Sequence, residues 1–230
     1  MMLKKAMILA AGLGSRLRQI TENIPKALVQ TEGKTLLQHA LEHVAKYGIR
    51  DVIINVHHFS EQIINYLTIH RHFGMNITLS DESDELLETG GGVKKARWFL
   101  DGTEPFLVRN VDILSDLDLI HMYTWHMKER PLATLAVRYR KTSRYFLFGM
   151  NMQLCGWENR ATGIRRLCRS AEPFKFLAFS GIQIIEPRIF PLIIETGKFS
   201  LTELYLRLAE DHPVNGYHEE ESRWKDAGKQ

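Results

Sequence analysis

The first half of the chain alternates short apolar runs with amphipathic segments. Residues 6–10 and 51–56 are apolar runs of strand length, and a third strand is predicted at residues 76–80. Residues 35–48 place Leu, Ala and Val at helical spacing. A second helix is expected from Ser60, which precedes apolar residues at the same spacing. This alternation of strand and helix predicts an α/β fold in which a mostly parallel sheet has helices on both faces.

The pattern changes near Arg138. Short β-like segments separated by turn residues follow, and residues 176–185 then form a long apolar run. A helix is predicted to begin at Pro187, and another at Ser200, because a serine with a glutamate three residues later is typical of a capped helix start. The change predicts two parts, residues 1–135 and a smaller mixed β part at 136–230. Because no linker separates them, we expect the two parts to share one core.

A turn rich in small residues follows the first apolar run. Gly12 and Gly14 lack a Cβ, so the backbone there can turn several N–H groups toward one point. Arg16, Arg18 and Lys26 bring positive charge to the same end of the expected strand. The turn therefore predicts a site for a polyphosphate.

Two other kinds of glycine-rich loop do not match this turn. A dinucleotide-binding loop needs a small residue where Leu17 stands, and an acid at the end of the second strand, which ends in Val56 and His57. A Walker loop needs a glycine where Leu28 stands, ahead of Gly33. The segment at Gly33 is better interpreted as a turn that leads into the next helix. For the first loop, a purely structural turn is the alternative.

The first loop belongs to a series of motifs that continues along the chain. The series is LAAGLGSRL at 9–17, PKAL at 25–28, LLETGGG at 86–92, FLVRNVD at 106–112, AFSGI at 178–182 and WKDAG at 224–228. In content and order it resembles the sugar-1-phosphate nucleotidyltransferases. Within that family the chain looks most like the short N-acetylmuramate-1-phosphate uridylyltransferases and the mannose- or heptose-1-phosphate guanylyltransferases.

The resemblance implies a reaction, a fold and a set of roles. A nucleoside triphosphate and a sugar 1-phosphate would give a nucleotide sugar and pyrophosphate with the help of Mg²⁺, in a monomer or homodimer of Rossmann-like fold. Residues 1–135 would bind the nucleotide and residues 136–230 the sugar phosphate. The implied catalytic residues are Arg16, Lys26 and Asp112, and the implied nucleotide-binding residues are Leu9, Ala10, Ala11, Gly12, Gly14, Ser15, Glu88, Thr89, Gly90 and Gly91. The implied sugar-binding residues are Asn110 and Gly181, and the implied metal ligands are Asp112 and Asp226.

Two positions depart from the family pattern. Glu88 stands where most relatives have glycine, and Val111 replaces the glycine that usually precedes the aspartate of its motif. Residues 89–92 are expected to form a glycine-rich turn that leads into a helix, where their exposed N–H groups suit an anion or the edge of a base. The structural alternative is that Thr89 caps this helix.

Two adjacent histidines, His57 and His58, follow the second expected strand. Neighbouring residues of a strand point to opposite faces, so the pair cannot chelate one ion together. We expect a structural or substrate-lining role for them rather than a catalytic one.

Composition excludes several classes of protein. The 230 residues are 44% hydrophobic and 25% charged, with a formal net charge of +3, which is ordinary for a soluble globular protein. No apolar run is long enough for a signal peptide or a membrane span, so we expect a cytoplasmic protein with no membrane partner. Cys155 and Cys168 lack metal-ligand spacing and are expected to stay reduced.

Arginines and lysines gather at residues 138–144 and 160–169. Such clusters suit nucleic acid, but few aromatic residues are interleaved with them. We interpret them as solvated faces of β-ribbons and expect no nucleic-acid partner.

The base, the sugar and two other functions stay open at this stage. Glu88 can accept a hydrogen bond from uracil or from guanine, so it does not select UTP or GTP. We favour UTP with N-acetylmuramate 1-phosphate, and a mannose- or heptose-1-phosphate guanylyltransferase is the alternative. A cytidylyltransferase acting on an alcohol phosphate or sugar acid usually has a different first loop. A regulatory protein that only senses a sugar nucleotide would not need Arg16, Lys26 or the two metal-binding acids, all of which are present.

Overall fold

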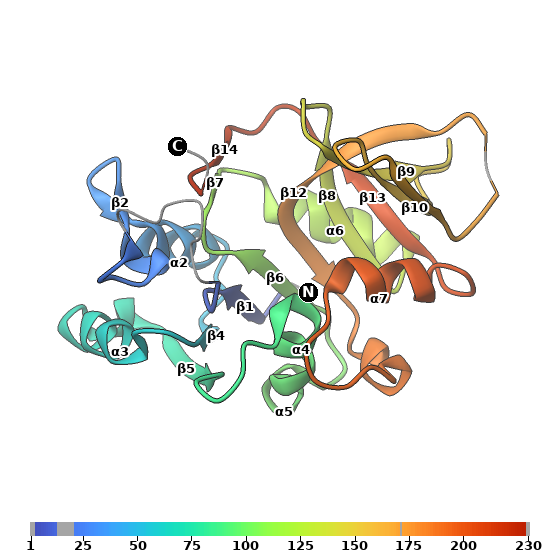
Figure 1. Cartoon of the computed structure of the whole chain (residues 1–230). Helices are drawn as coiled ribbons and strands as arrows, with labels where there is room; N and C mark the ends of the chain where they lie inside the picture. The colour runs from blue at the N-terminus through green and yellow to red at the C-terminus, as the bar shows by residue number, and fades with distance from the viewer. Residues whose placement is uncertain (1–2, 13–20, 171, 229–230) are drawn as a thin grey trace.

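Strands and helices alternate through the part of the chain that this computed structural model describes, which is residues 3–12, 21–170 and 172–228 (Figure 1). The strands are β1 (Lys5–Leu9), β2 (Gln30–Thr31), β3 (Lys34–Thr35), β4 (Asp51–Val56), β5 (Asn76–Asp81), β6 (Phe106–Asn110), β7 (Ile113–Ser115), β8 (Ala133–Arg138), β9 (Arg144–Phe148), β10 (Leu154–Asn159), β11 (Ile164–Leu167), β12 (Lys175–Ile185), β13 (Val214–His218) and β14 (Trp224–Asp226). The helices are α2 (Leu36–Lys46), α3 (Ser60–Ile69), α4 (Glu88–Lys95), α5 (Arg97–Leu100), α6 (Leu119–Glu129) and α7 (Leu201–Leu208). The 3-10 helices in these described ranges are η2 (Lys26–Leu28), η3 (Arg71–Gly74) and η4 (Pro187–Leu192).

One ten-stranded sheet organises these elements, in the order β11-β10-β9-β12-β6-β1-β4-β5, with β8 paired to β12 and β13 paired to β8. Strands β6, β1, β4 and β5 run parallel, and α2 and α3 provide the connections from β1 to β4 and from β4 to β5. The long strand β12 pairs antiparallel with β6, β8 and β9 and carries the sheet into the smaller β9-β10-β11 part. The predicted α/β fold, with a parallel sheet between helices and a smaller mixed β part, is confirmed.

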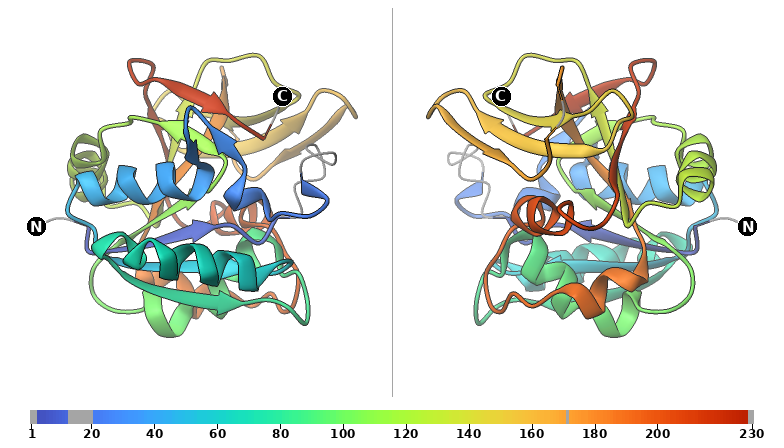
Figure 2. Two further views of the ribbon diagram at one scale, coloured as in Figure 1. Left: turned by 90° about the vertical axis from the view of Figure 1, so that its left-hand side faces the viewer. Right: turned by 90° about the vertical axis from the view of Figure 1, so that its right-hand side faces the viewer.

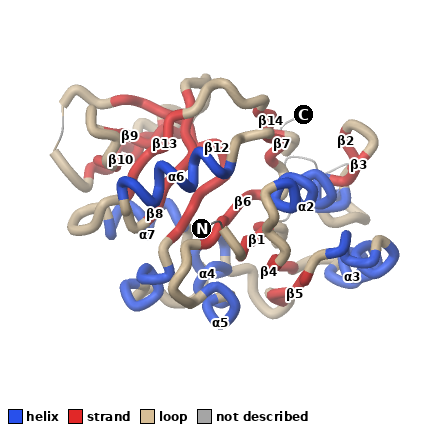
Figure 3. The backbone as a smooth tube through the Cα atoms, turned by 180° about the vertical axis from the view of Figure 1, so that it is seen from behind, coloured by secondary structure: helices blue, strands red, loops and turns tan. Residues whose placement is uncertain are grey.

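Alternate residues of the central strands face opposite sides of the sheet, and each side has its own hydrophobic core. In β1, Ala6 and Ile8 pack with α2, α3 and α6, whereas Met7 packs with α4, α5 and α7. Helices cover both faces of the central sheet (Figure 2). Viewed from behind, α6 lies against β8 (Figure 3). Because both faces are covered, the strand is apolar throughout, and this explains the continuous apolar run in the sequence.

Two predicted features of local structure are confirmed at helix starts. Gly33 adopts a φ of +80° in the turn between β2 and β3, which leads into α2. The hydroxyl of Ser200 accepts a hydrogen bond from the backbone N–H of Glu203 at 3.2 Å and so caps α7.

Two other elements differ from expectation. The helix at Pro187 is a 3-10 helix, because Pro191 lies inside it and has no N–H to donate. Helix α4 includes the glycines 90–92, which were expected to form a turn before the helix. The carbonyl oxygen of Phe199 accepts hydrogen bonds from the first two of these glycines, so the helix start is satisfied by another segment of the chain.

The two predicted halves are interleaved in the packing. The proposed boundary after residue 135 falls inside β8, and the core that contains Met7 also contains Tyr205 of α7. The division into a nucleotide-binding and a sugar-phosphate-binding half therefore stays a prediction about function. No helix within the described residues has the length and apolar character needed to span a membrane.

Candidate active site

Two cavities meet at the carboxyl ends of β1 and β6, the edge at which ligands bind in parallel sheets. We call the larger one, of about 450 Å³, the β14 cavity, and the smaller one, of about 320 Å³, the α4 cavity. Both are lined by Gly12, Lys26, Asn110 and Asp112, so these four residues lie where the cavities join. Lys26, Asn110 and Asp112 were all predicted site residues from motifs far apart in the sequence.

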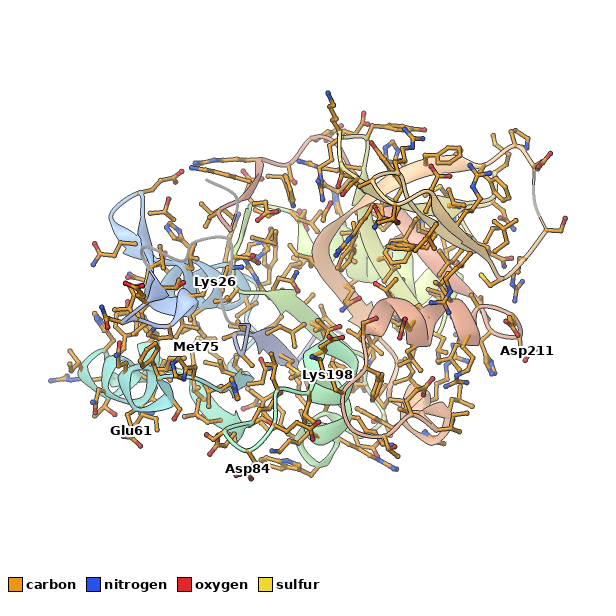
Figure 4. All side chains as sticks on the ribbon, viewed as in Figure 1. Lys26, Glu61, Met75, Asp84, Lys198 and Asp211 are labelled. Carbon is orange, nitrogen blue, oxygen red and sulfur yellow. The ribbon has the colours of Figure 1, made fainter. Side chains whose placement is uncertain are left out.

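An ion pair between Lys26 and Asp112 stands at this junction. Lys26 begins η2 directly after Pro25, and Asp112 lies in the turn between β6 and β7. Their side chains are only 17% and 14% exposed, so the pair is shielded from solvent on most sides. Figure 4 labels Lys26 on the N-terminal, blue part of the ribbon. The pair places a positive and a negative charge beside the point where both cavities open.

The second predicted metal ligand, Asp226, lies next to this pair. Strand β14 pairs antiparallel with β7, so that Asp226 is opposite Ile113, the neighbour of Asp112. A Cβ added to Gly228 would come within 2.6 Å of Oδ2 of Asp112, 2.8 Å of Nζ of Lys26 and 3.2 Å of Oδ1 of Asp226. The two carboxylates and the ammonium thus surround one glycine, and the fold brings the acids together from opposite ends of the chain.

This donor set fits a magnesium ion. Carboxylate oxygens are the protein ligands that Mg²⁺ prefers, and Mg²⁺ commonly uses one or two of them together with substrate phosphates and water. The ammonium of Lys26 forms an ion pair with the carboxylate of Asp112, so a cation is accommodated beside Asp112. Within the described ranges, no group of three or more His, Cys, Asp or Glu side chains could hold a metal by itself. A metal here would therefore depend on substrate oxygens to complete its coordination.

The end of β1 is fixed by a buried polar network that the sequence did not reveal. The amide of Ala10 donates to Oδ1 of Asn55 at 2.7 Å, and Nδ2 of Asn55 donates to Oε1 of Glu82 at 2.8 Å. Glu82 is fully buried, and its other oxygen accepts from the N–H of Leu87 at 3.1 Å. The predicted role of Ala10 stays a prediction, but its N–H already has a protein acceptor. Gly14, Ser15 and Arg16, the other predicted loop residues, lie outside the described residues.

Leu9, Ala11 and Gly12 line the α4 cavity, and their role in nucleotide binding stays a prediction. Glu88 and Thr89 line it from the opposite side. The cavity is therefore bounded by the end of β1 and by the start of α4.

Glu88 has an unusual backbone conformation. Its φ of 58° lies in the left-handed region that favours glycine. Its carboxylate is 3.6 Å from the ammonium of Lys198, whose label in Figure 4 lies beside α4. Both side chains are about half exposed, so this ion pair adds little stability.

Glu88→Gly is expected to stabilise the fold by roughly 0.5–1 kcal/mol. Glycine relieves the left-handed strain, of about 1–2 kcal/mol, but increases the entropy of the unfolded chain. Urea unfolding measures the difference. The matched control is Glu61→Gly in α3, an exposed helix position outside the positive-φ residues, which should lose about 1 kcal/mol. A loss of stability in both variants would contradict the strain at Glu88.

Two of the glycines after Thr89, Gly90 and Gly91, do not expose their N–H groups, so that expectation is wrong for them. The amides of Gly90 and Gly91 both donate to the carbonyl oxygen of Phe199, at 2.9 and 3.2 Å. A Cβ on Gly90 would come within 2.4 Å of the Phe199 ring, so glycine is needed here for close packing. Their assignment to nucleotide binding stays a prediction that rests only on their place beside Thr89. The hydroxyl of Thr89 accepts from the N–H of Leu201 at 2.9 Å, so it supports the start of α7 instead of capping α4.

Gly181 is required by the shape of β12. Its φ is +80°, it lies at an irregularity of the pairing with β8, and a Cβ would come within 2.5 Å of Cγ1 of Ile113. Gly181 also lines the β14 cavity, close to Asn110, whose Nδ2 would be 3.4 Å from that Cβ. The two predicted sugar-binding residues therefore lie side by side, and their role in binding stays a prediction.

Arg140 and Trp224 line the β14 cavity but were not predicted as site residues. The guanidinium carbon of Arg140 lies 4.4 Å from the centre of the Trp224 ring, and Nη2 of Arg140 donates to the carbonyl oxygen of Phe179 at 3.0 Å. Burial lowers the pKa of Arg140, and the negative charge of Asp226 opposes that shift. The position of Arg140 in the sequence could have identified it as a site residue. Strand β8 runs in the same direction as β6, and Arg140 follows the carboxyl end of β8.

Most other residues of the two basic clusters contact protein groups. Glu158 forms ion pairs with both Arg160 and Arg165, and Arg138 pairs with Glu219 at 2.9 Å. The absence of a nucleic-acid partner stays a prediction, but these arginines already have acidic partners.

His57 has a structural contact. Its Nδ1 donates to the carbonyl oxygen of Glu82 at 2.6 Å, and neither His57 nor His58 is among the described residues that line the two cavities. His57 therefore helps to join the ends of β4 and β5.

Comparison with known proteins agrees with this geometry. The model of the nucleotidyl transferase family matches residues 5–153. The N-acetylmuramate alpha-1-phosphate uridylyltransferase of Caulobacter vibrioides is 32% identical over 227 residues, covering 93% of this chain and 87% of that protein. The mannose-1-phosphate guanyltransferase of Yarrowia lipolytica is 30% identical over 232 residues, which are 97% of this chain but 60% of that protein.

Solved structures share the fold. The UDP-glucose pyrophosphorylase from Acinetobacter baumanii superposes with a TM-score of 0.80 over 99% of this chain and 89% of that one, at 20% identity. The resemblance seen in the sequence motifs is thus confirmed, and the chain belongs to the nucleotidyl transferase family, in which the relatives it matches are sugar-1-phosphate nucleotidyltransferases.

Proposed function

We propose that this protein transfers a nucleotide from UTP to N-acetylmuramate 1-phosphate, with release of pyrophosphate. One observation carries the proposal: both cavities are lined by Lys26 and Asp112, and Asp226 of the β14 cavity lies beside this pair. A reaction that joins two phosphorylated substrates needs two adjoining sites and a cluster of charges between them.

The α4 cavity is proposed to take the nucleotide. It is bounded by the end of β1, whose small residues let a ligand approach the backbone, and by Glu88 and Thr89, which can bond to a base. The β14 cavity is proposed to take the sugar phosphate. It offers aromatic rings for the sugar, including Trp157 and Trp224, and guanidinium groups for the phosphate, including Arg140.

The proposed chemistry is an in-line displacement at the α-phosphorus of the triphosphate. A phosphate oxygen of the sugar 1-phosphate forms the new P–O bond, and the bond to the β-phosphate oxygen breaks, so that pyrophosphate leaves with the electron pair. The attacking phosphate is already ionised, so no general base is needed, and catalysis depends on position and charge. Lys26 would neutralise the attacking phosphate. Asp112 and Asp226 would hold Mg²⁺, which would offset negative charge on the triphosphate.

The choice of UTP and the muramate sugar follows the relative matched over nearly its whole length, the Caulobacter uridylyltransferase. The Yarrowia guanyltransferase is longer, and this chain corresponds to 60% of it. Mannose- or heptose-1-phosphate guanylyl transfer is the second candidate, because Glu88 suits guanine as well as uracil. A protein that only sensed a nucleotide sugar would not need Lys26 to lie beside Asp112 and Asp226.

The test is pyrophosphate release with each of UTP, GTP, CTP, dTTP and ATP against N-acetylmuramate, N-acetylglucosamine, glucose and mannose 1-phosphates. We expect UTP with N-acetylmuramate 1-phosphate to give the highest kcat/KM. A preference for GTP with mannose 1-phosphate would select the second candidate. Tight binding of a nucleotide sugar without pyrophosphate release from any pair would instead support a sensor.

A further inference from the structure

Arg109 is a charged residue in the middle of the protein. It lies in β6, three residues before Asp112, and its side chain is 1% exposed. Among the described residues no carboxylate forms an ion pair with it, and its Nε has no hydrogen-bond partner. A buried cation without an adjacent counter-ion destabilises a fold, so its presence calls for a role that an apolar residue could not fill.

The contacts of Arg109 lead to the segment that follows Asp112. Nη2 of Arg109 donates to the carbonyl oxygen of Ile113, and Nη1 lies 2.7 Å from Nδ1 of His43 in α2. A guanidinium can only donate, so Nδ1 of His43 accepts and its Nε2 carries the proton. Nε2 of His43 then donates to the carbonyl oxygen of Leu117 at 3.0 Å. One relay therefore reaches two carbonyl groups, at the start of β7 and just beyond its end.

The charge states agree with this arrangement. Burial, with the charge of Arg109, lowers the pKa of His43 to about 3, so the imidazole is neutral and can accept from Arg109. Burial lowers the pKa of Arg109 only to about 10, and the negative charge of Asp112 favours its charged form. At neutral pH a charged guanidinium therefore donates to a neutral imidazole.

The segment that the relay contacts is adjacent to both predicted metal ligands. Asp112 directly precedes the segment 113–117 that Arg109 and His43 contact, and β7 in this segment pairs with β14, which carries Asp226. The N–H of Ala227 donates to the carbonyl oxygen of Asp112 at 2.9 Å, which joins the two strands at the site itself. In Figure 1, β7 and β14 lie together above the end of β6.

We propose that Arg109 and His43 are positioning residues that fix the β6–β7 turn, so that the carboxylates of Asp112 and Asp226 converge on one divalent cation. The inference rests on the proposed function, because that function supplies the cation. Neither residue contacts substrate in this proposal. Both act through backbone carbonyl groups of the segment that carries Asp112.

The test measures binding of Mn²⁺ to the full chain by electron paramagnetic resonance, with a non-hydrolysable UTP analogue present. Arg109→Met keeps the apolar bulk but removes the donors, and we expect the Mn²⁺ dissociation constant to rise about 10- to 100-fold, as is typical when a supporting contact of a ligand is lost. Arg109→Lys keeps the charge but has one donor nitrogen in place of three, and a smaller rise is expected. Amide hydrogen exchange at residues 113–117 should speed up in Arg109→Met.

His43 offers a pair of matched variants. His43→Gln can still accept from Arg109 and donate to Leu117, so its Mn²⁺ affinity should stay within a few-fold of the unsubstituted chain. His43→Leu can do neither and should resemble Arg109→Met. Because the pair differs in hydrogen bonding at one position, it tests the relay even if Arg109→Met fails to fold.

The control is Tyr47→Phe. The hydroxyl of Tyr47 also donates to the carbonyl oxygen of Leu117, at 3.2 Å, but Tyr47 forms no hydrogen bond to Arg109. It should lower stability slightly and leave Mn²⁺ affinity unchanged. Equal Mn²⁺ affinity in the unsubstituted chain, Arg109→Lys and His43→Leu would overturn the positioning role, as would an equal loss in Tyr47→Phe. Failure of the unsubstituted chain to bind Mn²⁺ would overturn the proposed metal site itself.

Discussion

Lys26→Met is expected to lower kcat by about 100- to 1,000-fold in a chain that still folds, because loss of one preorganised donor at a developing charge has an effect of that size. Lys26 lines both cavities at their junction, and its ammonium rests on Asp112. Methionine keeps the apolar stem and removes only the charge. Steady-state pyrophosphate release measures the loss, and the melting temperature checks folding.

Lys34→Met is the matched control for this prediction. Its ammonium is 2.6 Å from the carboxylate of Glu42, and both side chains are 42% exposed, so loss of the pair should change stability by at most about 1 kcal/mol. Activity should be unchanged. Near-normal turnover in Lys26→Met would remove this lysine from the catalytic group. Arg16→Ala is predicted from the sequence to lose activity to a similar extent, and Arg16 lies outside the described residues.

The fold was predictable because its signals are local. A strand buried on both faces must be apolar throughout, and a helix on a sheet must place apolar residues at helical spacing, so β1, α2 and β4 are visible in the sequence. The convergence of Asp112 with Asp226 was predictable for a different reason. It followed from motifs shared with a family, and no local pattern relates β7 to β14.

The sequence could not reveal contacts in which a single hydrogen bond or side chain joins segments that are far apart along the chain. Nothing near Gly90 shows that its N–H is taken by the carbonyl oxygen of Phe199, since that contact depends on how the chain returns before α7. Asn55 and Glu82 are likewise ordinary strand-end residues until the sheet places them side by side. Arg140 is an intermediate case, because the direction of β8 indicates its edge of the sheet, but its stacking on Trp224 is a tertiary contact.

Asp112→Asn and Asp226→Asn are each expected to abolish Mg²⁺-dependent turnover, with a loss of about 1,000-fold or more. In the unsubstituted chain, Oδ1 of Asp226 accepts from the N–H of Gly228 at 3.0 Å. Asparagine keeps the shape of the side chain and an acceptor oxygen, so this hydrogen bond can still form. What is lost is one unit of negative charge. Opposite unit charges about 4 Å apart attract by roughly 4 kcal/mol at an effective dielectric constant near 20, and a divalent ion increases that attraction.

Asp116→Asn is the control that distinguishes loss of a metal ligand from a general change in the structure around β7. Oδ1 of Asp116 accepts from the backbone N–H of Arg223 at 2.7 Å, so the residue joins the same two segments but is not among the described residues that line the two cavities. It should retain activity and the Mg²⁺ dependence of the unsubstituted chain. EDTA should remove activity from both the unsubstituted chain and Asp116→Asn, and added Mg²⁺ should restore it. Full activity of Asp226→Asn would mean that the second carboxylate of the metal site comes from elsewhere. Full activity of both Asp112→Asn and Asp226→Asn in EDTA would exclude a metal-dependent reaction at this site.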